Sequence, residues 1–285
     1  MQNNQIIKKI SAIIDKKKFY NAKDINSNFD IDSSLISLKR NLLNINKSIT
    51  INGYAVLKFN FERKKKIEDH INFYLKVGRN FGKFLSQNYE NETVVKVYNK
   101  GKNLKKGARY HESNISGNLH TDSPQFKITP QIVGLYCVNS AYKGGDTILV
   151  NSHEILESLI LEGQNKIELL QSKYFFEKRG KLKKKEERYS HEKILTIKNQ
   201  NITFRYLRDY IETAHKQLDC TLSEDQLNLF DSIDRNIAKK KFRKIIKLKN
   251  NQCIFINNKF MLHGRTKFYD RKNHKKRLFL RLWIK

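Results

Sequence analysis

The sequence predicts an α+β protein, and three observations lead to this class. Helix-spaced apolar residues occupy the N-terminal part, whereas short apolar runs rich in β-branched and aromatic residues occupy the middle and the C-terminal part. Hydrophobic residues make up 39% of the 285 residues and aromatic residues 11%, a globular composition that can bury a sizeable core. Because no internal repeat and no Pro- or Gly-rich linker interrupts the chain, we expect one domain over 1–285.

The N-terminal part is predicted to be helical over 1–47. Isoleucines between positions 6 and 14 and leucines between positions 35 and 43 recur at helix spacing, which indicates a helical N-terminal extension packed as a layer. The stretch 49–61 has the aromatic and β-branched content of a strand, and the run that follows, to about Gln87, is amphipathic. A strand covered by a helix is therefore expected.

The remainder alternates between strands and helices. Strands are predicted over 94–97, 132–138, 147–150, 245–249, 252–256 and 278–284. Helices are predicted over 152–161 and 223–240, the second with Ser223 as its capping residue and Gln226 completing a capping box. The highly charged stretch 178–193 has few apolar anchors, so it is predicted to be a solvated loop, with a mobile lid as the functional alternative.

The chain is strongly basic, with 57 Lys and Arg against 28 Asp and Glu and a formal net charge of +29. Such an excess can indicate binding to nucleic acid or anionic membranes. A codon bias toward Lys, Asn and Ile explains the same balance, and an anionic substrate or an acidic protein partner is the functional alternative. Cys137, Cys220 and Cys253 form no CxxC pair or disulfide framework, and no apolar stretch is long enough for a signal peptide or membrane span. A cytoplasmic protein without a membrane partner is expected.

The sharpest local chemistry lies between Gly117 and Pro124, where His120 and Asp122 stand two residues apart in a stretch expected to be extended. Side chains at positions i and i+2 of a strand project to one face, so both could hold one metal ion. A lone His-x-Asp tripeptide also arises by chance as a surface pair. A metal site therefore requires a further ligand elsewhere in the chain.

His263 is the candidate third ligand, because it follows a predicted strand and a turn. Two histidines and one carboxylate on one face of an octahedron leave three positions open, so a non-heme iron(II) centre can admit a chelating co-substrate together with O2. Further along, Arg277 and Arg281 are four residues apart on a strand-like run and face one side. Either guanidinium could hold a carboxylate through paired hydrogen bonds, and a basic strand edge is the alternative.

Four motifs in this order resemble the taurine dioxygenase/TfdA superfamily of Fe(II)/2-oxoglutarate-dependent dioxygenases, including its clavaminate-synthase-like members. They are His-Thr-Asp at 120–122, Gly-Gly-Asp-Thr at 144–147, Leu-His-Gly-Arg at 262–265 and the Arg277/Arg281 pair. The resemblance covers about 53–285 and implies a double-stranded β-helix (jelly-roll) core with flanking helices. It also implies that His120, Asp122 and His263 bind iron and form the catalytic centre.

The same resemblance implies that Thr147 and Arg277 bind the far carboxylate of 2-oxoglutarate, with Arg281 on the substrate side. Ser116 and Asn118, just before the first ligand, are further candidates for substrate binding, and a simple turn around Gly117 is the alternative. His111, His153 and His215 lack a partner pattern and are expected to be surface or core histidines.

The resemblance implies an enzyme that uses Fe(II), 2-oxoglutarate and O2, releases succinate and CO2, and oxidises a small polar metabolite such as an amino acid or its derivative. Hydroxylation is the default outcome, and desaturation or epoxidation stays open. One alternative is the same chemistry on a substrate tethered to an acidic carrier protein. Two alternatives belong to another class: a non-catalytic jelly-roll metal-binding protein and a basic nucleic-acid-binding protein. The presence of Thr147 and Arg277 argues against the first of them.

Two activities of similar enzymes are not expected. Halogenating relatives replace the carboxylate ligand by a small residue, whereas Asp122 is present here, so no chlorinated product should form. Nucleic-acid demethylases with the same cofactors carry an RxNxTxR pattern and a shorter gap between the second and third ligands, and this chain has neither. Nucleic acid is therefore not an expected substrate.

Overall fold

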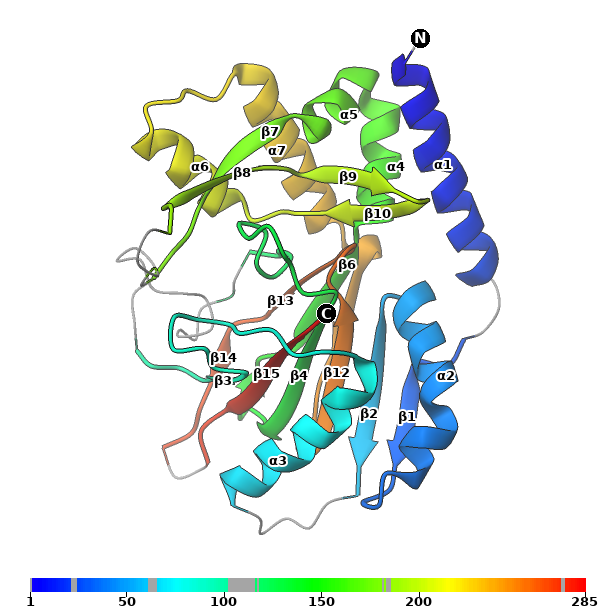
Figure 1. The fold of residues 1–285 in the computed structure, drawn as a ribbon, viewed down its shortest axis with the longest axis vertical. Helices are drawn as coiled ribbons and strands as arrows, with labels where there is room; N and C mark the ends of the chain where they lie inside the picture. Colours follow the sequence, from blue (N-terminus) through cyan, green and yellow to red (C-terminus); the bar gives the residue numbers. More distant parts are fainter. Residues whose placement is uncertain are drawn as a thin grey trace.

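A six-stranded sheet forms the centre of the fold, in a computed structural model that describes residues 2–21, 25–60, 66–101, 116, 118–180, 182, 186–272 and 275–285. The sheet order is β1-β2-β12-β4-β15-β3 (Figure 1). Its strands are β1 (Asn28–Ile31), β2 (Tyr54–Phe59), β3 (Val94–Val97), β4 (Ile132–Asn139), β12 (Gln252–Asn257) and β15 (Leu278–Ile284). β1 pairs with β2 in parallel, and the other neighbours are antiparallel.

Both faces of this sheet are buried, which explains why its strands are apolar along most of their length. On β2, Ala55 and Leu57 pack with α2 (Ile36–Ile51) and α3 (Ile67–Gly78), whereas Tyr54 and Val56 point to the opposite face. A short 3-10 helix, η1 (Arg79–Phe81), continues α3. The helices cover the outer face, and the inner face meets a second sheet.

The second sheet has the order β11-β6-β13 and faces the first across a shared core. Its strands are β6 (Thr147–Asn151), β11 (Arg243–Ile246) and β13 (Met261–Arg265), all antiparallel. Leu149 and Met261 of this sheet pack in one apolar cluster with Ile254 and Phe279 of the first. Beside it, β5 (Lys143–Gly144) pairs with β14 (Phe268–Tyr269).

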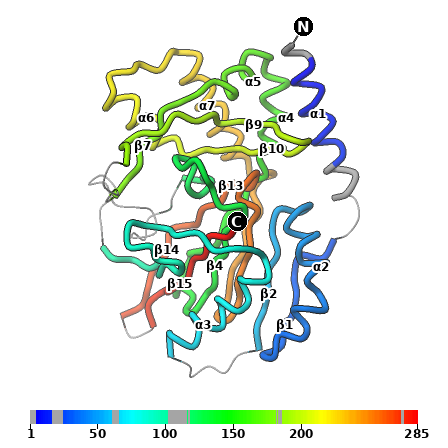
Figure 2. The backbone as a smooth tube through the Cα atoms, in the orientation of Figure 1, coloured from blue at the N-terminus to red at the C-terminus, as the bar shows by residue number. Residues whose placement is uncertain are grey.

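The other end of the molecule is a mixed layer around its own apolar core (Figure 2). Its helices are α1 (Gln2–Asn21), α4 (Ser152–Glu162), α5 (Gln164–Gln171), α6 (Arg208–Gln217) and α7 (Glu224–Ala238), followed by the 3-10 helix η4 (Lys240–Phe242). Two hairpins complete it: β7 (Lys173–Glu177) with β8 (Tyr189–Lys193), and β9 (Leu195–Lys198) with β10 (Asn201–Phe204). The segment from Phe204 to α6 runs from this layer to the pocket described below.

The α+β prediction is confirmed, and so are most of the strongly patterned elements. Strand β3 occupies the predicted residues, and β4, β6, β12 and β15 differ from prediction by a residue at most. Ser223 caps α7, because its side chain accepts a hydrogen bond from the backbone N–H of Gln226 at 3.2 Å while the Gln226 side chain accepts one from the backbone N–H of Ser223. The local pattern of these elements agrees with their tertiary environment.

Several predicted boundaries were wrong. The predicted helical stretch 1–47 is interrupted by strand β1, which gains its hydrogen bonds only by pairing with β2. Helix α2 extends to Ile51, so the predicted strand over 49–61 begins at Tyr54. The charged stretch 178–193 is not all loop, because its last five residues form β8, and His191 there stacks on Phe175 of β7. For β1 and β8, pairing with another strand decides the structure.

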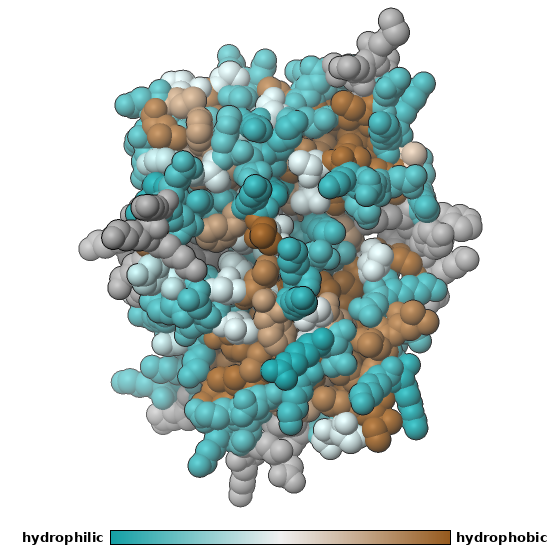
Figure 3. Space-filling view, in the orientation of Figure 1, coloured by the Kyte–Doolittle hydropathy of each residue, from teal (hydrophilic) through white to brown (hydrophobic). Residues whose placement is uncertain are grey.

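The cysteines and the surface complete the description. Cys137 and Cys253 are buried free thiols, whereas Cys220 is an exposed one. Hydrophilic side chains cover most of the face shown in Figure 3. Among the described residues, no helix combines the length and the apolar character that crossing a membrane requires.

Candidate active site

His120 and His263 face each other across two neighbouring chain segments. His263 lies in the middle of β13, and His120 forms an isolated antiparallel bridge with it. The backbone N–H of each residue donates to the carbonyl oxygen of the other, at 3.0 and 2.8 Å. This bridge sets the two imidazole rings side by side, with their centroids 5.1 Å apart. The extended conformation expected around His120 is therefore realised through one bridge instead of a full strand.

Both imidazole rings turn the same nitrogen toward the backbone. Nδ1 of His120 lies 2.7 Å from the carbonyl oxygen of Asn118, and Nδ1 of His263 lies 3.5 Å from that of Met261. Because a carbonyl oxygen only accepts hydrogen bonds, each Nδ1 carries a proton, and in a neutral imidazole this leaves the Nε2 lone pair for a metal ion. The two Nε2 atoms lie 3.5 and 3.7 Å from Oδ1 of Asp122.

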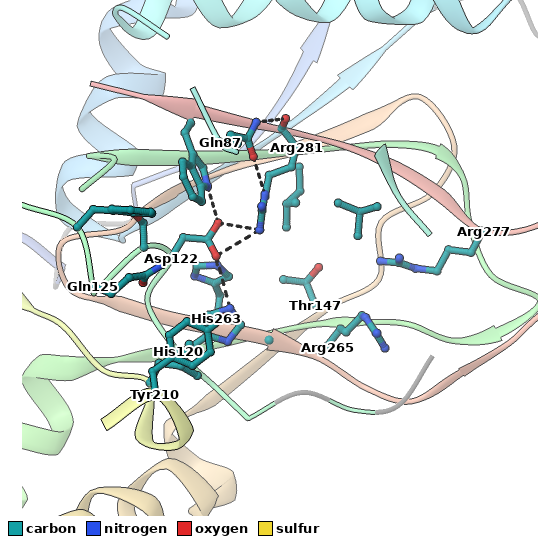
Figure 4. A pocket seen from close by; sticks show the side chains of 17 residues that line it. Gln87, His120, Asp122, Gln125, Thr147, Tyr210, His263, Arg265, Arg277 and Arg281 are labelled. Atoms are coloured by element: carbon teal, nitrogen blue, oxygen red, sulfur yellow. Dashed lines mark hydrogen bonds and ion pairs between the residues drawn. The ribbon is translucent and has the colours of Figure 1, made fainter. Parts of the chain in front are cut away.

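Asp122 is buried and held by two donors on its other oxygen (Figure 4). Oδ2 accepts a hydrogen bond from Nε1 of Trp283 at 2.7 Å and lies 3.3 Å from Nη1 of Arg281. Burial by itself would raise the pKa of Asp122, but the charge of the Arg281 guanidinium, together with the two neighbouring histidines, outweighs it and holds the pKa well below its usual range. The carboxylate is ionised, with Oδ1 turned to the histidines.

These three side chains fit a divalent metal ion. One nitrogen from each histidine and one oxygen of Asp122 lie within 4.8 Å of one another, and within the described part of the chain no other group of His, Cys, Asp or Glu does so. Two neutral imidazoles and one carboxylate on one side of an ion match the donor set of non-heme iron(II) centres. The hydrogen bonds at both Nδ1 atoms and at Oδ2 orient these ligands, as supporting groups do around protein metals.

A cavity of about 140 Å³ opens beside the triad, between the two sheets. Val97 and Leu135 line it from the six-stranded sheet, and Thr147 lines it from β6 of the facing sheet. Leu207 and Tyr210, at the start of α6, close the side toward the helical layer. A ligand in this cavity would touch the triad at one end and Thr147 further in.

Arg277 occupies the end of the cavity away from Asp122 (Figure 4). Only 5% of its surface is exposed, and neither its Nε nor its Nη1 has a hydrogen-bond partner within the described residues. Its guanidinium lies 4.0 Å from the centroid of the Phe279 ring. Burying a charged group without an acceptor is costly, so this end of the cavity favours an anion that supplies one.

The Gly-Gly-Asp-Thr motif explains how Thr147 and Arg277 come together. Gly144 has φ +71° in the β5–β14 pair, and a Cβ there would lie 2.1 Å from the carbonyl oxygen of Lys267. Gly145 has φ +76°. A Cβ added at Gly145 would lie 3.2 Å from Nε of Arg277, so the absence of a side chain leaves room for this guanidinium. Both positions need the left-handed backbone region and close approach that glycine allows.

The protein family that the chain matches agrees with this geometry. The family model for taurine catabolism dioxygenase TauD, TfdA family, matches residues 19–283. The chain belongs to the TauD/TfdA family. FR-33289 synthase from Streptomyces rubellomurinus (strain ATCC 31215) is 24% identical to this TauD/TfdA-family chain over 214 residues, which are 73% of this chain and 61% of that protein. The chain thus spans less than two thirds of that curated relative's length.

Two crystal structures show the same fold. Asparagine oxygenase in complex with Fe(II), 2S,3S-3-hydroxyasparagine and succinate is 13% identical, with a TM-score of 0.67 over 87% of this chain and 79% of that one. The non-heme iron oxygenase OrfP in complex with Fe, succinate and (3R,4R)-dihydroxy-L-Arg is 14% identical, with a TM-score of 0.63 over 88% of this chain and 81% of that one. The shared fold confirms the predicted jelly-roll core with flanking helices.

The structure brings most of the predicted site residues of this TauD/TfdA-family chain into one cavity. His120, Asp122 and His263 stand together, and Thr147, Arg277 and Arg281 line the same cavity. Ser116 and Asn118 do not line it: both are exposed, and Asn118 contributes its backbone carbonyl, which accepts from His120. His111 lies outside the described residues. His153 and His215 are buried, as expected of core histidines, and His215 accepts from the backbone N–H of Phe175.

Other site residues were missed at the sequence level. Trp283 and Gln87 hold Asp122 and Arg281 in place, Arg265 lines the cavity, and Asn258 clamps the backbone of Asp122. Arg265 carried a signal, because it stands two residues after His263 on one strand and so faces the same side. No sequence signal pointed to Gln87 and Asn258, because the residues that they contact are distant in sequence.

Replacing Asn258 by alanine is expected to loosen the metal site. Its Oδ1 accepts from the backbone N–H of Asp122 at 2.7 Å, and its Nδ2 donates to the carbonyl oxygens of Asp122 and Pro130, both at 3.0 Å. Asn258→Ala leaves three buried backbone groups unpaired, so we expect about 2–4 kcal/mol lower stability. Iron(II) affinity, measured by titration under anaerobic conditions, should fall about 10- to 100-fold.

The control is Asn250→Ala, which removes a side chain that accepts from the backbone N–H of Ser140 on an exposed loop. This variant should keep the iron affinity of the parent protein. Equal iron affinity in the Asn258 variant would contradict the role given to that side chain.

Proposed function

We propose that this chain is an Fe(II)- and 2-oxoglutarate-dependent dioxygenase that hydroxylates a small amino acid, or an amino acid derivative, with a neutral or acidic side chain. One observation carries the proposal. The cavity holds two imidazoles and an ionised carboxylate at one end and, at the other, the buried Arg277, whose Nε and Nη1 have no hydrogen-bond partner within the described residues. A 2-oxo diacid has a chelating head for the first end and a carboxylate for the second.

The residue roles follow from this placement. Nε2 of His120, Nε2 of His263 and Oδ1 of Asp122 would hold the iron, while Trp283 and Arg281 keep Oδ2 in place. Iron(II) with 2-oxoglutarate supplies O2 activation coupled to oxidative decarboxylation to succinate and CO2, which oxidises a nearby substrate carbon. Thr147 and Arg277 would take the far carboxylate through charge-assisted hydrogen bonds. The protein decides the product by where it places the substrate carbon.

The substrate side of the cavity offers one cation and two unpaired polar groups. Nε of Arg281 donates to Gln87 at 2.8 Å and its Nη1 faces Asp122, which leaves Nη2 for a substrate carboxylate. Oγ of Ser123 and Oε1 of Gln125 are buried in the cavity wall without hydrogen-bond partners within the described residues. Oε1 only accepts, so it suits an N–H group of the substrate. A carboxylate and an N–H donor together are the marks of an amino acid.

The charges of the cavity select against a cationic side chain. Asp122 is the one acidic residue among its described lining residues, against Arg265, Arg277 and Arg281. Iron(II) and 2-oxoglutarate carry equal and opposite charges, so the loaded cavity keeps a net positive charge. A buried cationic side chain would find like charge and, among the described lining residues, no carboxylate other than the metal ligand Asp122, which costs several kcal/mol (about 3–5). Neutral and acidic side chains avoid this cost.

A substrate panel tests the proposal. We expect substrate-dependent succinate release with iron, ascorbate and an amino acid of neutral or acidic side chain, and less than about a tenth of that rate with arginine or lysine. Mass spectrometry should find the gain of one oxygen atom in the product. Release with basic amino acids alone would overturn the charge argument, and no release with any free or carrier-bound amino acid would overturn the proposed substrate class.

A further inference from the structure

Two guanidinium groups lie at the inner end of the cavity (Figure 4). Arg277 precedes β15, and Arg265 is the last residue of β13. Both lie against one buried ring, that of Phe268, with the guanidinium carbons 4.9 and 4.8 Å from its centroid. Phe268 thus holds the two cations near one another.

Arg265 is also a direct neighbour of Thr147. The two residues pair across the β13–β6 ladder, so their side chains project to the same face of the sheet. His263 stands two positions before Arg265 on the same strand and shares that face. The backbone therefore aligns His263, Arg265 and Thr147 toward one cavity, from the metal end to the inner end.

The charge of Arg277 is only partly balanced by the protein groups described around it. Asp122, the acidic residue in the cavity wall, faces Arg281 and Trp283, and Asp270 accepts with Oδ1 from the backbone N–H of Arg277. Burial lowers the pKa of Arg277 to about 10, with the charge of Arg265 acting in the same direction, and burial lowers the pKa of Arg265 to about 10. Arg265 and Arg277 thus bring two like charges into one cavity, and a bound anion would reduce the repulsion between them.

We infer that Arg265 is a second cationic anchor for the far carboxylate of 2-oxoglutarate, together with Arg277 and Thr147. This inference rests on the proposed function. A carboxylate has about four lone-pair sites, enough to accept from two guanidinium groups and one hydroxyl. Two cations in place of one make the cavity selective for 2-oxo acids that carry a second carboxylate over those that end in a methyl group.

Binding of two co-substrate analogues to the iron(II)-loaded protein without O2 tests the inference. 2-Oxoglutarate and 2-oxopentanoate share the chelating head and the chain length, but only the first has a far carboxylate. In Arg265→Gln, titration calorimetry should find 2-oxoglutarate bound about 10- to 100-fold more weakly. Binding of 2-oxopentanoate should change less than about twofold, because its methyl end accepts no hydrogen bond from the guanidinium that is lost.

The matched control is Arg271→Gln, which removes the same charge from an exposed residue that lies over Tyr142. It should bind both acids as the parent does. Equal weakening of both acids in Arg265→Gln would mark a purely structural role and overturn the inference, as would unchanged binding of 2-oxoglutarate. Parent protein that binds iron(II) but neither acid would overturn the proposed function and the anchor with it.

Discussion

Asp122→Ala is expected to remove iron binding and turnover together. The variant loses the charged ligand of the triad and leaves the two neutral imidazoles, which bind a divalent ion more weakly. We expect substrate-dependent succinate release to fall by more than about 1,000-fold, well beyond the roughly 10- to 100-fold typical of losing a group that only supports a ligand. Metal analysis after anaerobic reconstitution should find less than one iron per chain at concentrations that saturate the parent.

Stability needs a separate measurement in this variant, because Asp122 also faces Arg281 and accepts from Trp283. Asp122→Asn keeps the shape and an oxygen for these donors, so it should unfold near the parent temperature and still lose most activity. Asp30→Ala is the control, since it removes an exposed carboxylate that pairs with Lys58. Undiminished turnover in Asp122→Ala would refute the ligand assignment.

Arg277→Gln should raise the KM for 2-oxoglutarate about 100-fold or more. Its buried guanidinium would make charge-assisted hydrogen bonds to the far carboxylate, and losing one partner of such a pair costs about 2–5 kcal/mol. The expected loss exceeds that of Arg265→Gln, because Arg277 is the more buried of the two and two of its nitrogens are unpartnered within the described residues. Initial rates at varied 2-oxoglutarate, with a saturating substrate, measure it directly.

The stability of Arg277→Gln distinguishes a ligand-binding role from a structural one. The side chain hydrogen-bonds to no described residue through Nε or Nη1 and keeps its charge at the cost of burial, so its loss should not lower the unfolding temperature of the unliganded protein. The rise in unfolding temperature on adding iron(II) and 2-oxoglutarate should shrink, since stabilisation follows affinity. An unchanged KM would show that the far carboxylate binds elsewhere.

Elements with a strong local pattern were predictable because their burial follows from the sequence period. Strand β12 is one example: Ile254 and Ile256 face the second sheet, while Cys253 and Phe255 face α2 and α3. Helix α7 is another, because its capping box is a local hydrogen-bond pattern. Strands β1 and β8 could not be predicted this way, since each depends on a partner strand and has no pattern strong enough alone.

The sequence by itself determined the chemistry of the metal end. A spacing of two places His120 and Asp122 on one side of an extended segment, and the four-residue spacing of Arg277 and Arg281 does the same, because side chains of extended backbone alternate. The place of His263 after a predicted strand and turn made it the candidate third ligand, and the family resemblance added Thr147. These are facts of local geometry and residue type, which any fold that keeps the segments extended would preserve.

Only the tertiary structure decided how those groups are supported and what else reaches the cavity. Trp283 donates to Asp122, Asn258 clamps its backbone, and Phe268 gathers Arg265 beside Arg277. Each of these contacts joins strands or loops that are distant in sequence and meet only where the two sheets pack. No local pattern of hydrophobic residues therefore predicts it. The physical reason is that a hydrogen bond or a shared ring depends on distance in space, whereas sequence patterns report distance along the chain.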